Sequence, residues 1–304
     1  MLISFNTSSP SYCQAEESKT RNVIHFFNTC TSHYDNRKGS LTIKVVLKGE
    51  ATYYFEQRKV RVHQGSFLLL HPGTAHRLEI DALYATQLIE IYFSQNMFQK
   101  LQRFKPGRDK LAMTDLQNPT ALLQQQTYVI SPSLRHLLRS LPIKAGEVNR
   151  CAFEDEQIIH RVLFCLHQFY GNSHQQLNSL KVRKHSTKME LYQRLHLAKD
   201  FILSNYENNI TLKDIGRASN IAPSHLLRHF PSFFNATPHQ MIIQLRINMA
   251  KALLQHTDFA VTEIIHRIGF KNDSSFIRLF KGTEGVTPVI YRLQYQKERF
   301  CLTA

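Results

Sequence analysis

Two stretches decide the fold: residues 212–238, LKDIGRASNIAPSHLLRHFPSFFNATP, and residues 261–288, VTEIIHRIGFKNDSSFIRLFKGTEGVTP. The second stretch repeats the first. In the first part of each copy the apolar residues match at a spacing of 49, which pairs Leu212 and Ile215 with Val261 and Ile264. In the second part the spacing is 50, which pairs Arg228, Phe230, Thr237 and Pro238 with Arg278, Phe280, Thr287 and Pro288. The middle of the second copy therefore holds one extra residue.

Each copy predicts a helix, a tight turn and a second helix. The turns fall at Asn220 and Gly269, and Asn and Gly are the residues that tolerate a left-handed backbone. The second helix of the first copy is predicted to begin with Pro223 at its first position, and that of the second copy with Asn272 as its N-cap. The pattern therefore predicts two helix-turn-helix motifs.

An amphipathic stretch, residues 239–255 (HQMIIQLRINMAKALLQ), predicts a long helix that joins the two copies. A short helix pair of this kind lays its second helix in the major groove of DNA. Two such pairs on one domain would occupy adjacent major-groove segments, about 34 Å apart on one face of the duplex. The alternative is an ordinary helical bundle that uses helix-turn-helix units only for packing.

Residues 189–294 resemble the DNA-binding domain of the AraC/XylS family of bacterial transcription regulators, most specifically in the second copy, VTEI…GF…SSFIRLFKGTEGVTPVIYR. The resemblance implies recognition helices near residues 223–230 and 272–282. It places base-facing positions at Ser224, Leu227, Arg228, Asp273, Ser274, Ser275 and Arg278. The arginines suit bidentate contact with guanine, and Lys281 is placed to meet phosphate. Alternatively, Leu227 is simply an exposed apolar residue and Asp273 an acid favoured by the helix dipole.

The sequence departs from the family pattern at three positions. Ala222 stands where the first recognition helix usually has a Ser or Thr cap, and Pro231 stands where a basic residue usually follows Arg-x-Phe. Because proline costs about 3 kcal/mol in a helix interior, we expect the first recognition helix to be short or kinked and the second to dominate DNA affinity. Ile265 replaces a small residue between packed helices, which predicts looser or shifted packing there.

The front half has a different pattern. Residues 41–93 contain short runs rich in Val, Ile, Leu, Tyr and Phe, separated by turn signals at 48–49, 57–58, 64–65 and 72–73. This predicts a small antiparallel barrel or sandwich. Residues 131–142 and 154–170 then carry helical apolar stripes, which either cap the barrel or pair with a second copy. The stripes consist of Leu134, Leu137 and Leu138, and of Ile158, Val162, Cys165 and Leu166.

The passage around Gly65, Pro72, Gly73 and His76 resembles the sugar-binding, cupin-like barrel that precedes the DNA-binding domain in many such regulators. Inward-facing polar and aromatic residues of a small barrel commonly hold a ligand. Our candidates are Tyr54, His76 and Tyr92, although alternation alone does not fix which face points inward. The histidine-x-histidine element of metal-dependent cupins is missing before Gly65, so no metal or cofactor is expected.

The expected architecture is an α+β multidomain chain: a cupin-like ligand-sensing and dimerisation domain (1–172), a linker (173–188) and an all-α DNA-binding domain (189–304). The net charge of +15 over 304 residues indicates a polyanionic partner. Residues 181–304 are the more basic part, with 18 Lys and Arg against 9 Asp and Glu. The start MLISFNTSSPSY has no secretory pattern, and no apolar run suits a membrane span, so we expect a cytoplasmic protein without a membrane partner.

The sequence thus favours a sequence-specific transcription regulator that binds double-stranded DNA and an effector of unknown identity. The resemblance also implies a homodimer and contact with RNA polymerase. Two other classes remain open: a cupin-type enzyme with an accessory nucleic-acid-binding domain, and an architectural DNA binder without sequence preference. The enzyme is disfavoured because no metal triad and no nucleophile–base pair can be assembled from the motifs.

Overall fold

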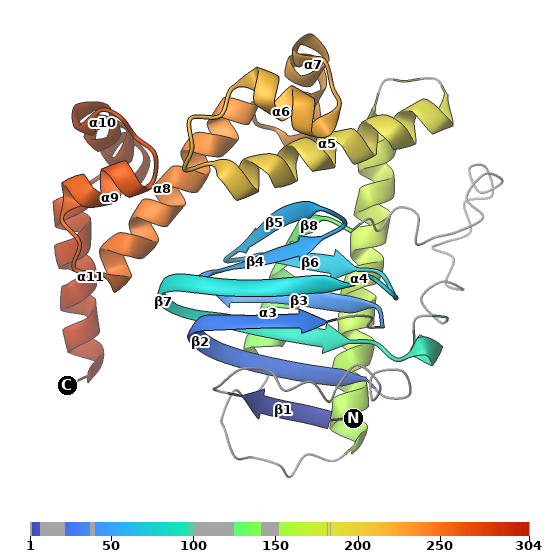
Figure 1. Cartoon of the computed structure of the whole chain (residues 1–304). Coiled ribbons are helices and arrows are strands. Elements are labelled where there is room, and N and C mark those ends of the chain that lie inside the picture. The colour runs from blue at the N-terminus through green and yellow to red at the C-terminus, as the bar shows by residue number, and fades with distance from the viewer. Residues whose placement is uncertain are drawn as a thin grey trace. The chain divides into compact units, whose positions relative to one another are not determined.

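The computed structural model describes residues 2–6, 22–36, 40–97, 99, 125–140, 152–180, 182 and 184–303. The chain divides into two compact units, residues 1–196 and 197–304. Strands dominate the first unit and helices form the second, as the sequence predicts (Figure 1). No helix in the described part of the chain is long and apolar enough to cross a membrane.

The first unit is a nearly closed barrel whose sheet follows the order β1-β2-β7-β3-β6-β8, with β4 pairing β5 and β7. Its pairings are antiparallel apart from the parallel pair β1–β2. The long strand β7 is central, because its second half pairs with β2 and β3 while its first half pairs with β2 and β4. The strands are β1 (Leu2–Asn6), β2 (Val23–Asn36), β3 (Thr42–Lys48), β4 (Glu50–Phe55), β5 (Arg58–His63), β6 (Ser66–Leu70), β7 (His76–Tyr92) and β8 (Thr127–Val129).

The turns fall where the sequence predicts them. Gly49, Gly65 and Gly73 take positive φ angles between successive strands, and Glu56 and Gln57 form a left-handed turn between β4 and β5. Strands β1, β2 and β8 lie outside the stretch predicted as β. The C-terminal half of β2, residues 29–36 (TCTSHYDN), is largely polar, so it lacks the apolar run that marks the other strands.

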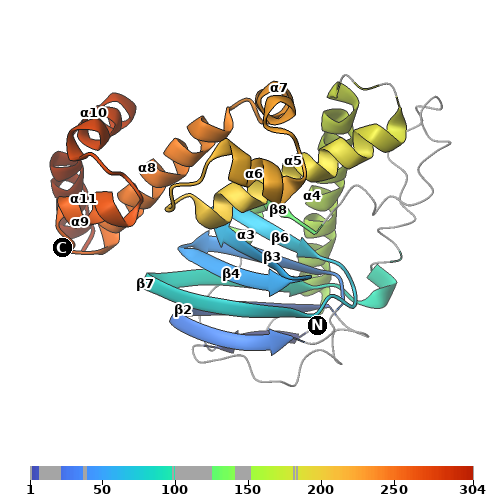
Figure 2. The same cartoon turned by 45° about the horizontal axis from the view of Figure 1, so that its top comes forward.

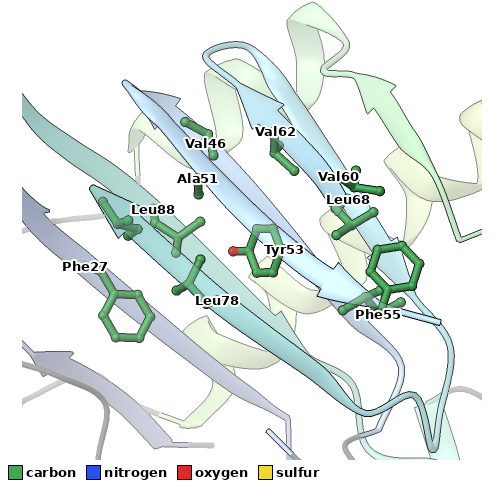
Figure 3. Packing of buried hydrophobic residues seen from close by; sticks show 12 residues of the cluster. Phe27, Val46, Ala51, Tyr53, Phe55, Val60, Val62, Leu68, Leu78 and Leu88 are labelled. Atoms are coloured by element: carbon green, nitrogen blue, oxygen red, sulfur yellow. The ribbon is translucent and has the colours of Figure 1, made fainter. Parts of the chain in front are cut away.

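The barrel interior is filled mainly by apolar side chains that alternate with outward-facing ones along each strand. Figure 3 shows these side chains converging between the strands. The cluster includes Phe27 on β2, Val46 on β3, Tyr53 on β4, Val62 on β5 and Leu88 on β7, all nearly inaccessible to solvent. The cross-strand pairs Val46–Leu88 and Phe27–Leu88 put these residues on one face of the sheet, which is therefore the inner face.

The outer face of the sheet is covered by helices of the same chain, α3 (Pro132–Ser140) and α4 (Ala152–Ser179). Their predicted stripes are buried except for the half-buried Ile158. Phe169 of α4 contacts Phe67 of β6 with 5.2 Å between ring centroids. Both helices thus bury their apolar stripes within one chain, while Phe164 of α4 stays 64% exposed.

The stretch predicted as a linker, residues 173–188, is largely helical. Helix α4 continues to Ser179, and α5 (His185–Asn205) begins shortly after it. Ser173, Leu177 and Leu180 are buried and recur at helical spacing, so even this polar stretch has one packed face. That sparse stripe, two leucines and a serine among many polar residues, is why the sequence pattern indicates a linker.

The second unit contains the C-terminal part of α5 and six further helices. Helix α8 separates two helix pairs, α6–α7 and α9–α10, and both views show one pair near each end of it (Figures 1 and 2). The helices are α6 (Leu212–Ser219), α7 (Pro223–Phe234), α8 (Pro238–His256), α9 (Val261–Arg267), α10 (Asp273–Glu284) and α11 (Pro288–Thr303).

Candidate DNA interface and ligand site

The first helix pair begins at a capping box. The Thr211 side chain accepts a hydrogen bond from the Asp214 backbone N–H (3.3 Å), and the Thr211 N–H donates to the Asp214 carboxylate (2.9 Å). Hydrogen bonds from the Thr211 hydroxyl and N–H hold the pKa of Asp214 below its usual value. Helix α6 then ends at Asn220, whose left-handed backbone (φ 53°, ψ 42°) makes the predicted turn.

The turn of the first motif closes tightly over Gly216. The Ile221 N–H donates to the Gly216 carbonyl at 2.9 Å. A Cβ at position 216 would lie 2.6 Å from the Ile221 carbonyl oxygen, closer than real Cβ contacts come. The first motif therefore requires glycine at this position.

The second motif closes in the same way but with more room. The Phe270 N–H donates to the Ile265 carbonyl at 3.1 Å, the equivalent of the bond between Ile221 and Gly216. Gly269, at φ +88°, takes the place of Asn220. The extra residue falls after this bond, before the cap of the next helix, so Ile265 fits where the first motif needs glycine. Ile265 is fully buried between the packed helices, and looser or shifted packing there stays a prediction.

Gly269 is also fixed by its surroundings. A Cβ there would lie 2.1 Å from the Glu207 carbonyl oxygen. Arg246 of α8 secures the same region, because its guanidinium donates to the Tyr206 carbonyl (2.7 Å) and the Asn208 carbonyl (2.9 Å) and lies over the Phe270 ring. The second turn is thus held against the end of α5 by backbone contacts and one arginine.

The two recognition helices start differently. In α10 the Asn272 side chain accepts from the Ser275 N–H at 2.9 Å, which is the predicted N-cap. In α7 the cap position holds Ala222, which makes no side-chain hydrogen bond, and Pro223 occupies the first turn. Since a Ser, Thr, Asp or Asn cap contributes about 1 kcal/mol to helix stability, α7 begins with less support.

Pro231 does not shorten the first recognition helix. Helices α7 and α10 both contain 12 residues, so the expectation of a shorter α7 is wrong. The last turn of α7 is anchored by aromatic packing, with ring centroids 4.6 Å apart for Phe230–Phe234 and 4.7 Å for Phe233–Phe234. This packing, with Asn235 as a left-handed C-cap, offsets the backbone hydrogen bond that proline cannot make.

The residues expected to face DNA lie on the exposed side of both recognition helices. Leu226 and Phe230 of α7, and Phe276 and Phe280 of α10, point into the domain core. The opposite faces carry the side chains expected to contact DNA. Asp273 is half-buried, and the others are exposed: Ser224, Leu227, Arg228, Ser274, Ser275, Arg278 and Lys281. Ile277 of α10 is also exposed, at 39%, and sequence reasoning missed it although it matches Leu227 in the repeat.

The barrel interior holds a polar group beside its apolar core. The Lys44 ammonium lies 2.7 Å from the Glu90 carboxylate, and both side chains are buried. The Tyr92 hydroxyl accepts from Lys44 (2.8 Å) and donates to Glu90 (2.7 Å). The Tyr53 hydroxyl also donates to Glu90, at 3.4 Å. Strands β3, β4 and β7 thus bring an ammonium, a carboxylate and two phenols together inside the barrel.

Two buried histidines complete this polar group. The His25 ring packs on the Tyr92 ring at 5.4 Å, and the His76 ring lies 6.2 Å from the Tyr53 ring. Burial lowers the pKa of His25 to about 4 and that of His76 to about 3, so both imidazoles are neutral at pH 7. Burial also lowers the pKa of Lys44, against the opposing effect of Glu90.

The structure brings His76 and Tyr92 together but not Tyr54. Tyr54 is half-exposed on the outer side of β4, where the Arg77 guanidinium lies 4.3 Å from its ring centroid. Its neighbour Tyr53 takes the inward position because side chains alternate along a strand. The sequence does not identify Lys44 and Glu90 as site residues. Each lies between two β-branched apolar residues, a pattern typical of a strand whose charged side chain faces solvent.

Comparison with known proteins agrees with both halves of this picture. Residues 30–163 match the family model of the AraC-like ligand binding domain, and residues 215–294 match that of a helix-turn-helix domain. An HTH-type transcriptional regulator of Bacillus subtilis, YdeC, is 25% identical over 82% of each chain. The melibiose operon regulatory protein of Escherichia coli is 21% identical, covering 94% of this chain and 96% of its own.

A solved structure of ToxT from Vibrio cholerae is 15% identical and covers 90% of this chain and 97% of its own, with a TM-score of 0.37. The two family models account for the barrel with its following helices and for both helix-turn-helix motifs, in the order that the sequence predicts. The chain belongs to the AraC family of transcriptional regulators, with an N-terminal AraC-like ligand-binding domain and a C-terminal helix-turn-helix DNA-binding domain.

Proposed function

We propose that α7 and α10 enter successive major-groove segments of an operator and read bases with Ser224, Leu227, Arg228, Asp273, Ser274, Ser275 and Arg278. The outward faces of the two helices carry this proposal, because each presents an exposed arginine opposite a buried aromatic core. Lys281 follows Arg278 by three residues, about one helical turn, and is exposed as well. It would meet phosphate and anchor α10 without specifying sequence.

The first motif offers further phosphate contacts. Lys213 and Arg217 of α6 line a shallow hollow together with Asn220 and the start of α7. Arg217 is strongly exposed and lies 3.9 Å from Asp214, a pairing that solvent weakens. The equivalent positions of α9 hold Thr262 and His266, so the second motif lacks these two basic side chains.

We infer that the effector binds at the polar group formed by His25, Lys44, Tyr53, His76, Glu90 and Tyr92. A small molecule rich in hydroxyl groups suits it, because the charged and phenolic groups can both donate and accept while the rings pack on C–H faces. Two relatives that align along most of this chain are named as regulators of melibiose and raffinose operons, which supports a sugar as effector.

We further infer a homodimer that acts in the cytoplasm, where it would also contact RNA polymerase. The exposed Phe164 on α4 is one of the apolar residues that a partner copy would cover. An enzymatic role is the weaker alternative, because the relatives are transcriptional regulators. Metal analysis and turnover assays on the purified chain would detect a cupin-type enzyme.

The proposed division into residues 1–172, 173–188 and 189–304 is tested with a fragment of residues 181–304, which keeps all of α5. We expect it to bind DNA selected by the full-length chain, with an affinity that falls steeply as salt rises, because bound phosphates release counterions. A folded fragment that fails to bind, even when fused to a foreign dimerising domain, would contradict the proposal. Equal affinity for selected and scrambled DNA would indicate an architectural binder instead.

A further inference from the structure

The two recognition helices present the same three side-chain types at equivalent positions. In α7 these are Ser224, Leu227 and Arg228, and the repeat spacing of 50 places Ser274, Ile277 and Arg278 at the same points of α10. Residues at i, i+3 and i+4 share one face of a helix. All six side chains are exposed.

The aliphatic member of each set needs an explanation. Leu227 is 49% exposed and Ile277 is 39% exposed, whereas the residues just before them, Leu226 and Phe276, are fully buried. An aliphatic side chain gains free energy when an apolar partner removes it from water. In the major groove that partner is the 5-methyl group of thymine, while an arginine one residue further along suits guanine O6 and N7.

We propose that both recognition helices read the same short element, a T·A pair beside a G·C pair, so that the operator contains this element twice. Leu227 and Ile277 contact the thymine methyl groups, and Arg228 and Arg278 contact the neighbouring guanines. This rests on the proposed placement of α7 and α10 in the major groove.

The spacing of the two elements follows from helix α8. It contains 19 residues between the two motifs, a length of about 28 Å at 1.5 Å per residue. This is comparable to one turn of B-DNA, so the elements should lie about one turn, or 10–11 base pairs, apart. The flanking positions differ between the helices, with His225 and Pro231 in α7 against Ser275 and Lys281 in α10. The shared element should therefore have different neighbours.

The first test is selection by the full-length protein from random duplexes of about 30 base pairs, roughly three helical turns. Recovered DNA should contain the T·A and G·C element twice, about one turn apart. Two unrelated elements, or one element alone, would overturn the inference while leaving sequence-specific binding intact. Failure to enrich any sequence would instead overturn the proposed function.

The second test removes only the methyl groups. Replacing the thymine of either element by deoxyuridine should weaken binding about fourfold, the value expected for one buried methyl-sized group. Leu227→Ala should abolish the effect at one element, and Ile277→Ala should abolish it at the other. Leu293→Ala is the matched control, because Leu293 is a similarly exposed aliphatic residue on α11, outside both recognition helices.

The result that overturns the methyl contacts is equally direct. Wild-type protein that binds thymine and deoxyuridine duplexes equally, or alanine variants that keep the full methyl effect, would show that these side chains do not contact thymine. The deoxyuridine comparison uses unaltered protein, so it does not depend on the variants folding. Thermal unfolding of each variant checks that the fold is kept.

Discussion

The two helix-turn-helix motifs differ in how the turn packs against the first helix of each pair. The first closes its turn directly over Gly216, while the second inserts one more residue and buries Ile265 at the equivalent position. Both keep the same hydrogen bond across the turn, at 2.9 Å and 3.1 Å. A difference of one residue in turn length thus decides whether the equivalent buried position must be glycine, as at Gly216, or holds a large apolar side chain, as at Ile265.

The largest expected effect comes from breaking these two requirements. Ile265→Ala should destabilise the DNA-binding unit by about 2–5 kcal/mol, because it leaves a cavity in a fully buried site. Gly216→Ala should cost about 1–3 kcal/mol for the opposite reason, since the new Cβ meets a backbone oxygen at 2.6 Å. Urea unfolding of both variants measures the two costs.

Gly282→Ala is the matched control for this pair. Gly282 lies in α10 with nothing within 4 Å of an added Cβ, so alanine there should stabilise the helix by about 0.5–1 kcal/mol. If Gly216→Ala stabilises the unit as Gly282→Ala does, the first turn is not closed over Gly216 as described.

The next effect concerns the two arginines. Arg278→Ala should weaken operator binding by about 1–3 kcal/mol, the usual contribution of a bidentate arginine–guanine contact. Arg228→Ala should cost distinctly less, because α7 lacks a side-chain cap at Ala222, so ordering its first turn on DNA offsets part of its contact energy. Anisotropy titration on operator and scrambled DNA measures both, and a larger loss for Arg228→Ala would contradict this ranking.

A smaller effect is expected at Lys281 of α10, whose equivalent in α7 is Pro231. Lys281→Ala should lower affinity for all DNA sequences alike and reduce the salt slope by about one unit. Pro231→Lys installs the equivalent residue in α7 and should raise the slope by about the same amount. A change confined to operator DNA would mean that Lys281 reads a base rather than a phosphate.

Local signals in the sequence predict more of the two motifs than of the barrel. The repeat spacing predicts both turns and the cap at Asn272, because these depend on neighbouring residues. The length of α7 was not predictable from Pro231 alone, since packing of three phenylalanines near the helix end outweighs the local cost. In the barrel, alternation alone does not show which face of a strand points inward, so the sequence does not distinguish Tyr54 from Tyr53, which the fold buries. Such faces depend on pairings between distant strands.

The smallest expected effect is a pH dependence that belongs to the first motif. His225 and His229 lie on α7, where α10 has Ser275 and Leu279. Burial and the nearby Arg228 and His225 charges lower the pKa of His229, so this imidazole is neutral at pH 7.5 in the absence of DNA. Protonation of a histidine near phosphate adds positive charge, so bound DNA raises the pKa of His229 and affinity should increase a few-fold as pH falls from about 7.5 to about 5.5.

The barrel histidines do not contribute over this range, because the pKa of His25 is about 4 and that of His76 is about 3. The double variant His225→Ser with His229→Leu copies the second motif at these two positions and should remove the increase. Anisotropy titration at constant ionic strength measures the affinity at each pH. An unchanged pH profile in the double variant would contradict the assignment to α7 and would point to another histidine of this unit, such as His266 of α9.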